Sequence, residues 1–147
     1  MGLFTRMVAT RAPASVVLIR FLVGLVFISE GIQKFLFSES VGAGRFAKIG
    51  LPQAELLATV VGSFEIVCGL FICLGLLTRL AVIPTIAIML MAIAMTKIPI
   101  LLESGFWKMA HESRTDWSML LGSLFLLLVG AGPWSLDAVW MRAKSKS

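Results

Sequence analysis

Charged residues are scarce in this 147-residue chain, at 14% of the sequence. Hydrophobic residues make up 59%, and the mean hydropathy is +0.97. Soluble domains carry roughly a quarter charged residues, so this composition cannot supply the surface of a soluble protein. The sequence therefore predicts an integral membrane protein whose surface faces mostly lipid.

Residues that bind metals or haem are also few. His111 is the only histidine, which excludes bis-histidine haem ligation, and no Cys, His and Asp residues have metal-ligand spacing. His111, Glu112 and Asp116 are interpreted as a solvated loop, so no metal site is predicted. There is no serine-centred elbow and no Walker-type phosphate loop. Any redox chemistry would use a bound quinone or a partner's electron carrier, and no covalently bound cofactor is expected.

The two cysteines, Cys68 and Cys73, are five residues apart in one apolar stretch. On a helix their side chains point about 140° apart, which is too far for a bridge within that helix. We interpret them as small buried apolar residues.

Hydrophobic stretches of spanning length occur four times, at about residues 14–37, 54–77, 80–102 and 117–132. About 20 residues cross the hydrocarbon layer, and a spanning segment must satisfy its own backbone hydrogen bonds. The sequence thus predicts one all-α transmembrane domain over residues 1–147, an integral membrane four-helix bundle. Pro84 and Pro99 should kink or end the third helix.

The distribution of charge in the flanks predicts orientation. The N-terminus, the turn near residue 79 and the C-terminal tail are basic, whereas the two longer loops carry more acidic than basic residues. By the positive-inside rule, both termini face the cytoplasm (N-in/C-in). Because the bases lie in short flanks, no nucleic-acid partner is expected. The basic flanks contain Arg6, Arg11, Arg79, Arg142, Lys144 and Lys146 against one acid, Asp137.

The first loop contains Gly42, Gly44 and Ala47 at the spacing of a dinucleotide-binding fingerprint. That fingerprint requires a preceding strand, and here a membrane helix precedes it. We predict instead a short amphipathic or re-entrant segment in this first outer loop, around Arg45 to Ile49.

Five ionisable residues fall inside the predicted spans, where each costs roughly 2.5 to 3.5 kcal/mol at a helix centre. Arg20 and Lys34 are far enough apart to extend toward opposite membrane surfaces. Glycines share a face with these charges on the first and second helices, so we expect the two faces to pack together. The five candidates for a polar pocket that binds a cofactor are Arg20, Glu30, Lys34, Glu65 and Lys97.

Two interpretations of these charges stay open. Glu30, Lys34, Glu65 and Lys97 are two acids and two bases that could neutralise one another in a cavity open to the outer face. They form either a structural ion-pair network or a polar binding site, and we weigh the two equally.

Short motifs distributed along the chain resemble those of one family. They are Arg20, Gly24, Phe27, Gly31, Lys34 and Phe35, then Phe46 and "GLP" at 50–52, then Glu65, Gly69 and "GLLTR" at 75–79, and finally "GPWSLD" at 132–137. In order and spacing the chain resembles the DoxX family of small four-helix bacterial membrane proteins.

The resemblance implies a multi-pass protein of the bacterial inner (cytoplasmic) membrane. The family is linked with membrane oxidoreductase complexes, thiosulfate-to-quinone electron transfer and thiol or oxidative-stress defence. Its polar positions correspond here to Arg20, Lys34, Glu65, Arg79 and Asp137, whereas Glu30 and Lys97 lie outside the family pattern.

The leading hypothesis is a DoxX-like membrane subunit of a redox system, possessing a polar intramembrane pocket for a quinone or a small oxidised substrate. The alternative is a non-enzymatic membrane scaffold or supernumerary subunit of a larger membrane complex. The expected partners are the lipid bilayer and either other proteins of such a complex or further copies of the chain. Whether the chain is an enzyme stays open at this point.

Overall fold

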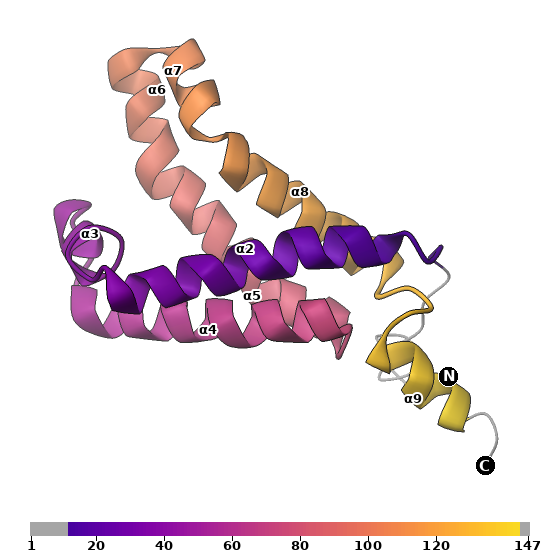
Figure 1. Cartoon of the computed structure of the whole chain (residues 1–147). Helices are drawn as coiled ribbons and strands as arrows, with labels where there is room; N and C mark the ends of the chain where they lie inside the picture. Colours follow the sequence, from indigo (N-terminus) through magenta and orange to yellow (C-terminus); the bar gives the residue numbers. More distant parts are fainter. Residues whose placement is uncertain (1–11, 145–147) are drawn as a thin grey trace.

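The computed structural model describes residues 12–144, so Arg6, Arg11 and Lys146, which entered the orientation prediction, lie outside the described residues. Every regular element within this range is helical (Figure 1). The helices are α2 (Val16–Leu36), α3 (Ala43–Lys48), α4 (Ala54–Leu74), α5 (Thr78–Ala92), the π-helix η1 (Ile93–Lys97), α6 (Ile98–Ser104), α7 (Phe106–Glu112), α8 (Arg114–Val129) and α9 (Leu136–Lys144).

Three helical segments in the described part are long and apolar enough to cross a membrane: Val16–Leu36, Ala54–Leu74 and the continuous run Thr78–Ser104. They confirm the predicted all-α class, and they match the first three predicted spans in position and in length. The fourth predicted span corresponds to α8, which begins and ends three residues earlier than expected and has 16 residues. This length is below the ~20 residues of a typical span.

Helices α2 and α4 lie side by side and make the most extensive helix contact of the fold (Figure 1). A Cβ atom added at Gly24 would lie 2.7 Å from the carbonyl oxygen of Gly69. One added at Gly31 would lie 2.6 Å from that of Gly62. Only glycine allows so close an approach at these positions, which confirms that the two glycine faces pack together.

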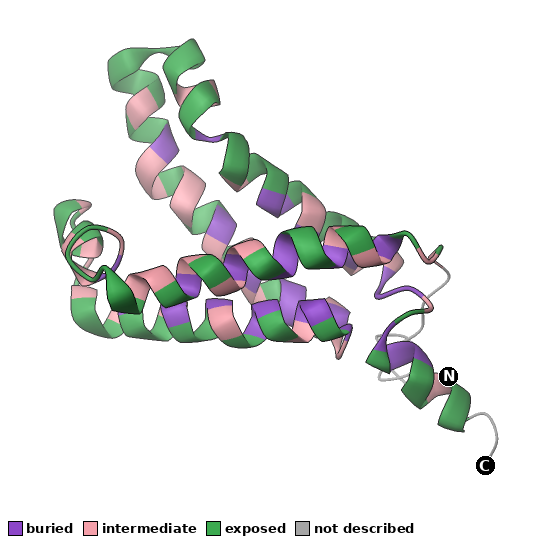
Figure 2. Ribbon diagram, viewed as in Figure 1, coloured by how far each residue is buried: buried purple, intermediate pink, exposed green. Residues whose placement is uncertain are grey.

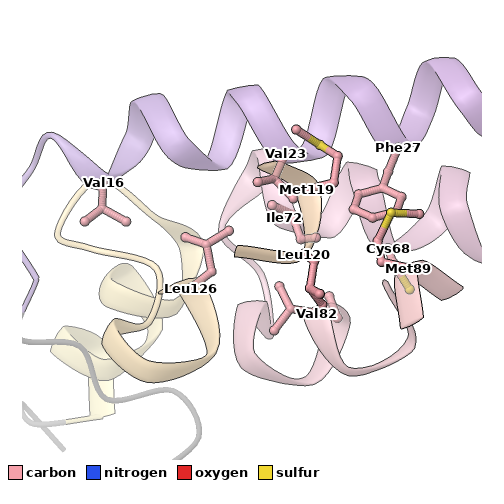
Figure 3. Close-up of a cluster of buried hydrophobic side chains, with 11 residues drawn as sticks. Val16, Val23, Phe27, Cys68, Ile72, Val82, Met89, Met119, Leu120 and Leu126 are labelled. Carbon is pink, nitrogen blue, oxygen red and sulfur yellow. The ribbon is translucent and has the colours of Figure 1, made fainter. Parts of the chain in front are cut away.

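The hydrophobic core lies where α2, α4, α5 and α8 meet (Figure 3). Val23, Ile72, Val82 and Leu126 are fully buried there, and Phe27 is 1% exposed. Many large apolar side chains instead lie on the outward faces of the helices, where much of the surface is exposed (Figure 2). In a membrane protein these faces contact lipid.

The third long helix changes its hydrogen bonding once. Pro84 lies inside α5 without ending it. Directly before Pro99, the amide of Ile98 donates to the carbonyl of Ile93, an i to i+5 bond that defines the π-turn η1. The hydrogen bonding thus changes directly before Pro99, one of the two prolines expected to disturb this helix.

The two pairs of helices diverge toward one end of the molecule. Figure 1 shows α6 and α7 far from α3, although α5 and α8 meet α2 and α4 near the middle. The first loop contains the six-residue helix α3, which packs on α4 at this open end. A short helix therefore occurs where the sequence predicted an amphipathic or re-entrant segment.

Candidate functional site

A cleft of about 500 Å³ opens between the diverging helix pairs. Its walls are mainly apolar and include Phe27, Met89, Met95 and Met119. Methionine side chains are flexible and polarizable, so such walls adapt to ligands of different shapes. Ionisable side chains from five helical elements also line the cleft: Glu30, Lys34, Arg45, Glu65, Lys97 and Asp116.

The shortest ion pair in the cleft joins α2 to α4. Lys34 Nζ lies 2.7 Å from Glu65 Oε2, and Glu65 is only 1% exposed. The close approach of the glycine faces brings the two side chains together. Lys34 Nζ also lies 4.0 Å from Glu30 Oε2. Lys34 therefore points into the protein and does not extend to the membrane surface.

A second ion pair joins the π-turn to the first turn of α8. Lys97 Nζ lies 3.3 Å from Asp116 Oδ2, and both side chains are mostly buried. The four charges that the sequence placed in one cluster thus belong to two separate groups on the same cleft: Lys34 with Glu30 and Glu65, and Lys97 with Asp116. Asp116, which the sequence pattern assigned to a solvated loop, belongs instead to this second pair. Asp116 comes directly before an apolar run, and an acidic residue at that place is typical of the first turn of a helix. This pattern could have placed Asp116 on the helix and not in a loop.

Arg20, the fifth predicted pocket residue, is not among the residues that line this cleft. Its guanidinium is 2% exposed and donates four hydrogen bonds to backbone carbonyls. The acceptors are Ile72 at 3.0 Å and Cys73 at 2.6 Å on α4, with Ala131 at 3.0 Å and Trp134 at 2.6 Å after α8. Arg20 is therefore a structural residue that joins three segments.

Asp137 reinforces the same end of the molecule. Its carboxylate accepts hydrogen bonds from the amides of Leu77 at 2.7 Å and Thr78 at 3.1 Å, which caps α5. A Cβ atom at Gly75, where φ is 66°, would lie 2.7 Å from Arg20 Cζ. We call Arg20, Gly75 and Asp137 with their backbone partners the clasp.

The two cysteines lie near these features. Cys68 belongs to the buried core and the backbone of Cys73 to the clasp, and both are buried free thiols, as predicted.

These features define a helical membrane protein whose helices are joined tightly at one end and enclose a charged, largely apolar cleft at the other. The model of the DoxX family matches residues 15–98, more than half of the chain. The chain therefore belongs to the DoxX family.

Two relatives cover most of the chain. The "Uncharacterized membrane protein Rv3486" of Mycobacterium tuberculosis is 51% identical over 138 residues, covering 90% of this chain and 85% of the relative. The "Putative oxidoreductase CatD" of Bacillus subtilis is 28% identical over 127 residues, covering 86% and 87%. No solved structure matches the chain.

Proposed function

We propose that the chain is the ligand-binding membrane subunit of a redox system and that its cleft takes a quinone or a similar small oxidised molecule. The observation that carries the proposal is the Lys34–Glu65 pair, a buried charge pair in the wall of an apolar cleft. Ionisable groups inside a membrane are costly and usually belong to functional sites. The printed name of the Bacillus relative, an oxidoreductase, supports the same class.

The chemistry of the cleft suits such a ligand. A planar ring can pack against Phe27 and the thioethers of Met89 and Met119. The ammonium of Lys34 or Lys97 can donate to a quinone carbonyl, and the paired carboxylate can accept from the hydroxyl of the quinol form. Each ion pair thus offers both a donor and an acceptor to the two redox states of one ligand.

The alternative is a non-enzymatic scaffold, or supernumerary subunit of a membrane complex, in which the pairs only fix the packing of helices. It is favoured by the fact that both lysines of the cleft already have a carboxylate partner within 4.0 Å. Removing one partner of a buried pair is strongly destabilising, whereas replacing both by apolar residues is often neutral. A double apolar replacement therefore removes the charges while keeping the fold, so loss of a bound molecule can be measured apart from unfolding.

The deciding experiment compares wild type with the double variant Lys34→Met/Glu65→Leu, which keeps the volume of the pair and removes its charge. Each protein is purified in mild detergent, and copurifying molecules are identified by native mass spectrometry and organic extraction. If the cleft is a ligand site, the double variant stays folded and loses a quinone or other small molecule present in wild type. Glu55→Gln, which changes an exposed acid on the same helix, should retain it.

If wild type contains only lipid but purifies with a larger complex, the scaffold function replaces the proposal. The single variant Glu65→Gln provides a further comparison, because it leaves Lys34 buried without its carboxylate. It should be less stable than the double variant if the charges pair as described.

We also propose that α8 is the fourth span of a four-helix bundle, with both termini on the cytoplasmic side of a bacterial inner membrane. The apolar sequence of α8 and its packing against α5 and α2 support this arrangement. Single cysteines at Lys48 on α3 and Lys144 on α9, in a background without Cys68 and Cys73, report the topology. A membrane-impermeant maleimide should label intact cells at position 48 alone, and labelling at 144 would contradict the proposal.

A further inference from the structure

Arg45 on α3 lies at the cleft but was not among the predicted pocket residues. We propose that Arg45 selects ligands that carry an anionic group on an apolar body. The inference rests on the proposed function, since it requires the cleft to bind a ligand.

The placement of Arg45 follows from the first loop. Helix α3 packs on α4, and Arg45, Phe46 and Ile49 line the cleft together with Lys34 of α2. Arg45 is exposed, whereas only 9% of the side-chain surface of Lys34 is exposed. A ligand that enters from the exposed side therefore meets the guanidinium before it reaches the buried ion pair.

Arg45 differs from the other two cations of the cleft, Lys34 and Lys97, in its ion-pair partners. Lys34 is paired with Glu65, and Lys97 with Asp116. Within residues 12–144, no carboxylate lies within ion-pair distance of Arg45. An incoming anion can therefore bond to this guanidinium without displacing an internal partner.

The side chain also matches the chemistry of the ligand. A guanidinium is planar and binds carboxylate, sulfonate or phosphate oxygens with two parallel N–H groups. Phe46 and Ile49 beside it, with Leu51, provide apolar surface for the rest of the molecule. This chemistry is shared by an anionic aromatic compound and by an anionic phospholipid.

The test measures binding of two probes to the full-length protein in detergent by equilibrium dialysis, with empty micelles subtracted. The probes are anthraquinone-2-sulfonate and the neutral 2-hydroxymethylanthraquinone. Arg45→Gln should weaken sulfonate binding about tenfold, as expected for one charge-assisted hydrogen bond, and leave the neutral probe nearly unchanged. Lys48→Gln removes the same charge from the same helix outside the cleft and should affect neither probe.

A parallel measurement identifies a lipid source. The three proteins are purified from mixed phosphatidylglycerol and phosphatidylcholine, and bound lipid is counted by native mass spectrometry. Loss of phosphatidylglycerol in Arg45→Gln alone would support the proposal with a phospholipid as the ligand. Equal binding of the sulfonate by all three proteins, with no difference in lipid, would overturn it while leaving the cleft a ligand site. If neither probe binds and no lipid is retained, the proposed function fails as well.

Discussion

The two ends of this molecule hold buried charge in different ways. At the clasp, Arg20 and Asp137 bond to backbone groups, which cannot move without unfolding a helix end. At the cleft, Lys34 and Lys97 bond to carboxylate side chains while the helices diverge around them. A charge held by the backbone stabilises the fold, whereas a charge held by another side chain can change partners when a ligand arrives. The following variants test this difference.

The largest effect is expected from Arg20→Leu. It removes the Arg20 donor from four carbonyl oxygens of the clasp. The carbonyl of Ile72 still accepts from the amide of Gly75, but the other three lose this partner, and each buried unsatisfied group costs about 1–3 kcal/mol. The free energy of unfolding should fall by more than about 3 kcal/mol, measured by denaturant titration in detergent. Arg142→Leu, at an exposed position of α9, should change it by less than about 0.5 kcal/mol. Similar losses in both variants would contradict the structural role of Arg20.

A smaller loss is expected from Gly24→Ala in the packed half of the molecule. The added methyl group would lie 2.7 Å from the carbonyl oxygen of Gly69, so α2 and α4 must separate. Overpacking of this kind costs about 1–3 kcal/mol, to be measured as a shift of the same unfolding curve. Ser63→Ala, on the exposed face of α4, is the matched control. Unchanged stability of Gly24→Ala would show that the helices can move apart freely.

Asp137→Ala should cost about 1–2 kcal/mol, because the first amides of α5 lose their charged cap. Asp137→Asn keeps one carbonyl oxygen as an acceptor and should cost less. Hydrogen exchange at the start of α5 should increase in both variants, and it should increase more in Asp137→Ala than in Asp137→Asn. Equal exchange in Asp137→Ala and wild type would exclude the capping role.

The smallest effect on stability is expected from Asp116→Asn at the cleft. The side chains of Lys97 and Asp116 are mostly buried, at 10% and 19% exposure, but asparagine keeps a side-chain oxygen that can accept a hydrogen bond from Lys97 Nζ. The loss should therefore be limited to about 1 kcal/mol. Hydrogen exchange should nevertheless rise in η1 and at the start of α8, while α2 and α4 stay unchanged. A loss as large as that of Arg20→Leu would remove the distinction between the two ends.

Much of this fold could be predicted from the sequence, because lipid imposes simple rules. Apolar runs of about 20 residues predicted four spans, and three of them are helices of spanning length in the described structure. Glycines recurring with Glu65 on one helix face predicted the α2–α4 contact. The same periodicity correctly placed Lys34 beside Glu65.

Other features depended on contacts between distant segments. The role of Arg20 requires carbonyls from residues 131 and 134, which no helical periodicity relates to position 20. The pairing of Lys97 with Asp116 depends on a turn whose path the intervening residues do not specify. For this reason the sequence assigned Arg20 to the pocket and Asp116 to the solvent.

The π-turn has a consequence for how this helix can change by mutation. A π-turn contains one residue more than the α-helical turn it replaces, and each residue rotates a helix by about 100°. Deleting one residue from Ile93–Lys97 would convert the segment to an ordinary α-helical turn and leave α6 in nearly the same rotation relative to α5, because the π-turn already absorbs that extra residue. A single-codon deletion within the π-turn should thus preserve which side chains of α6 face the cleft, whereas the same deletion within α5 would rotate everything after it by about 100°.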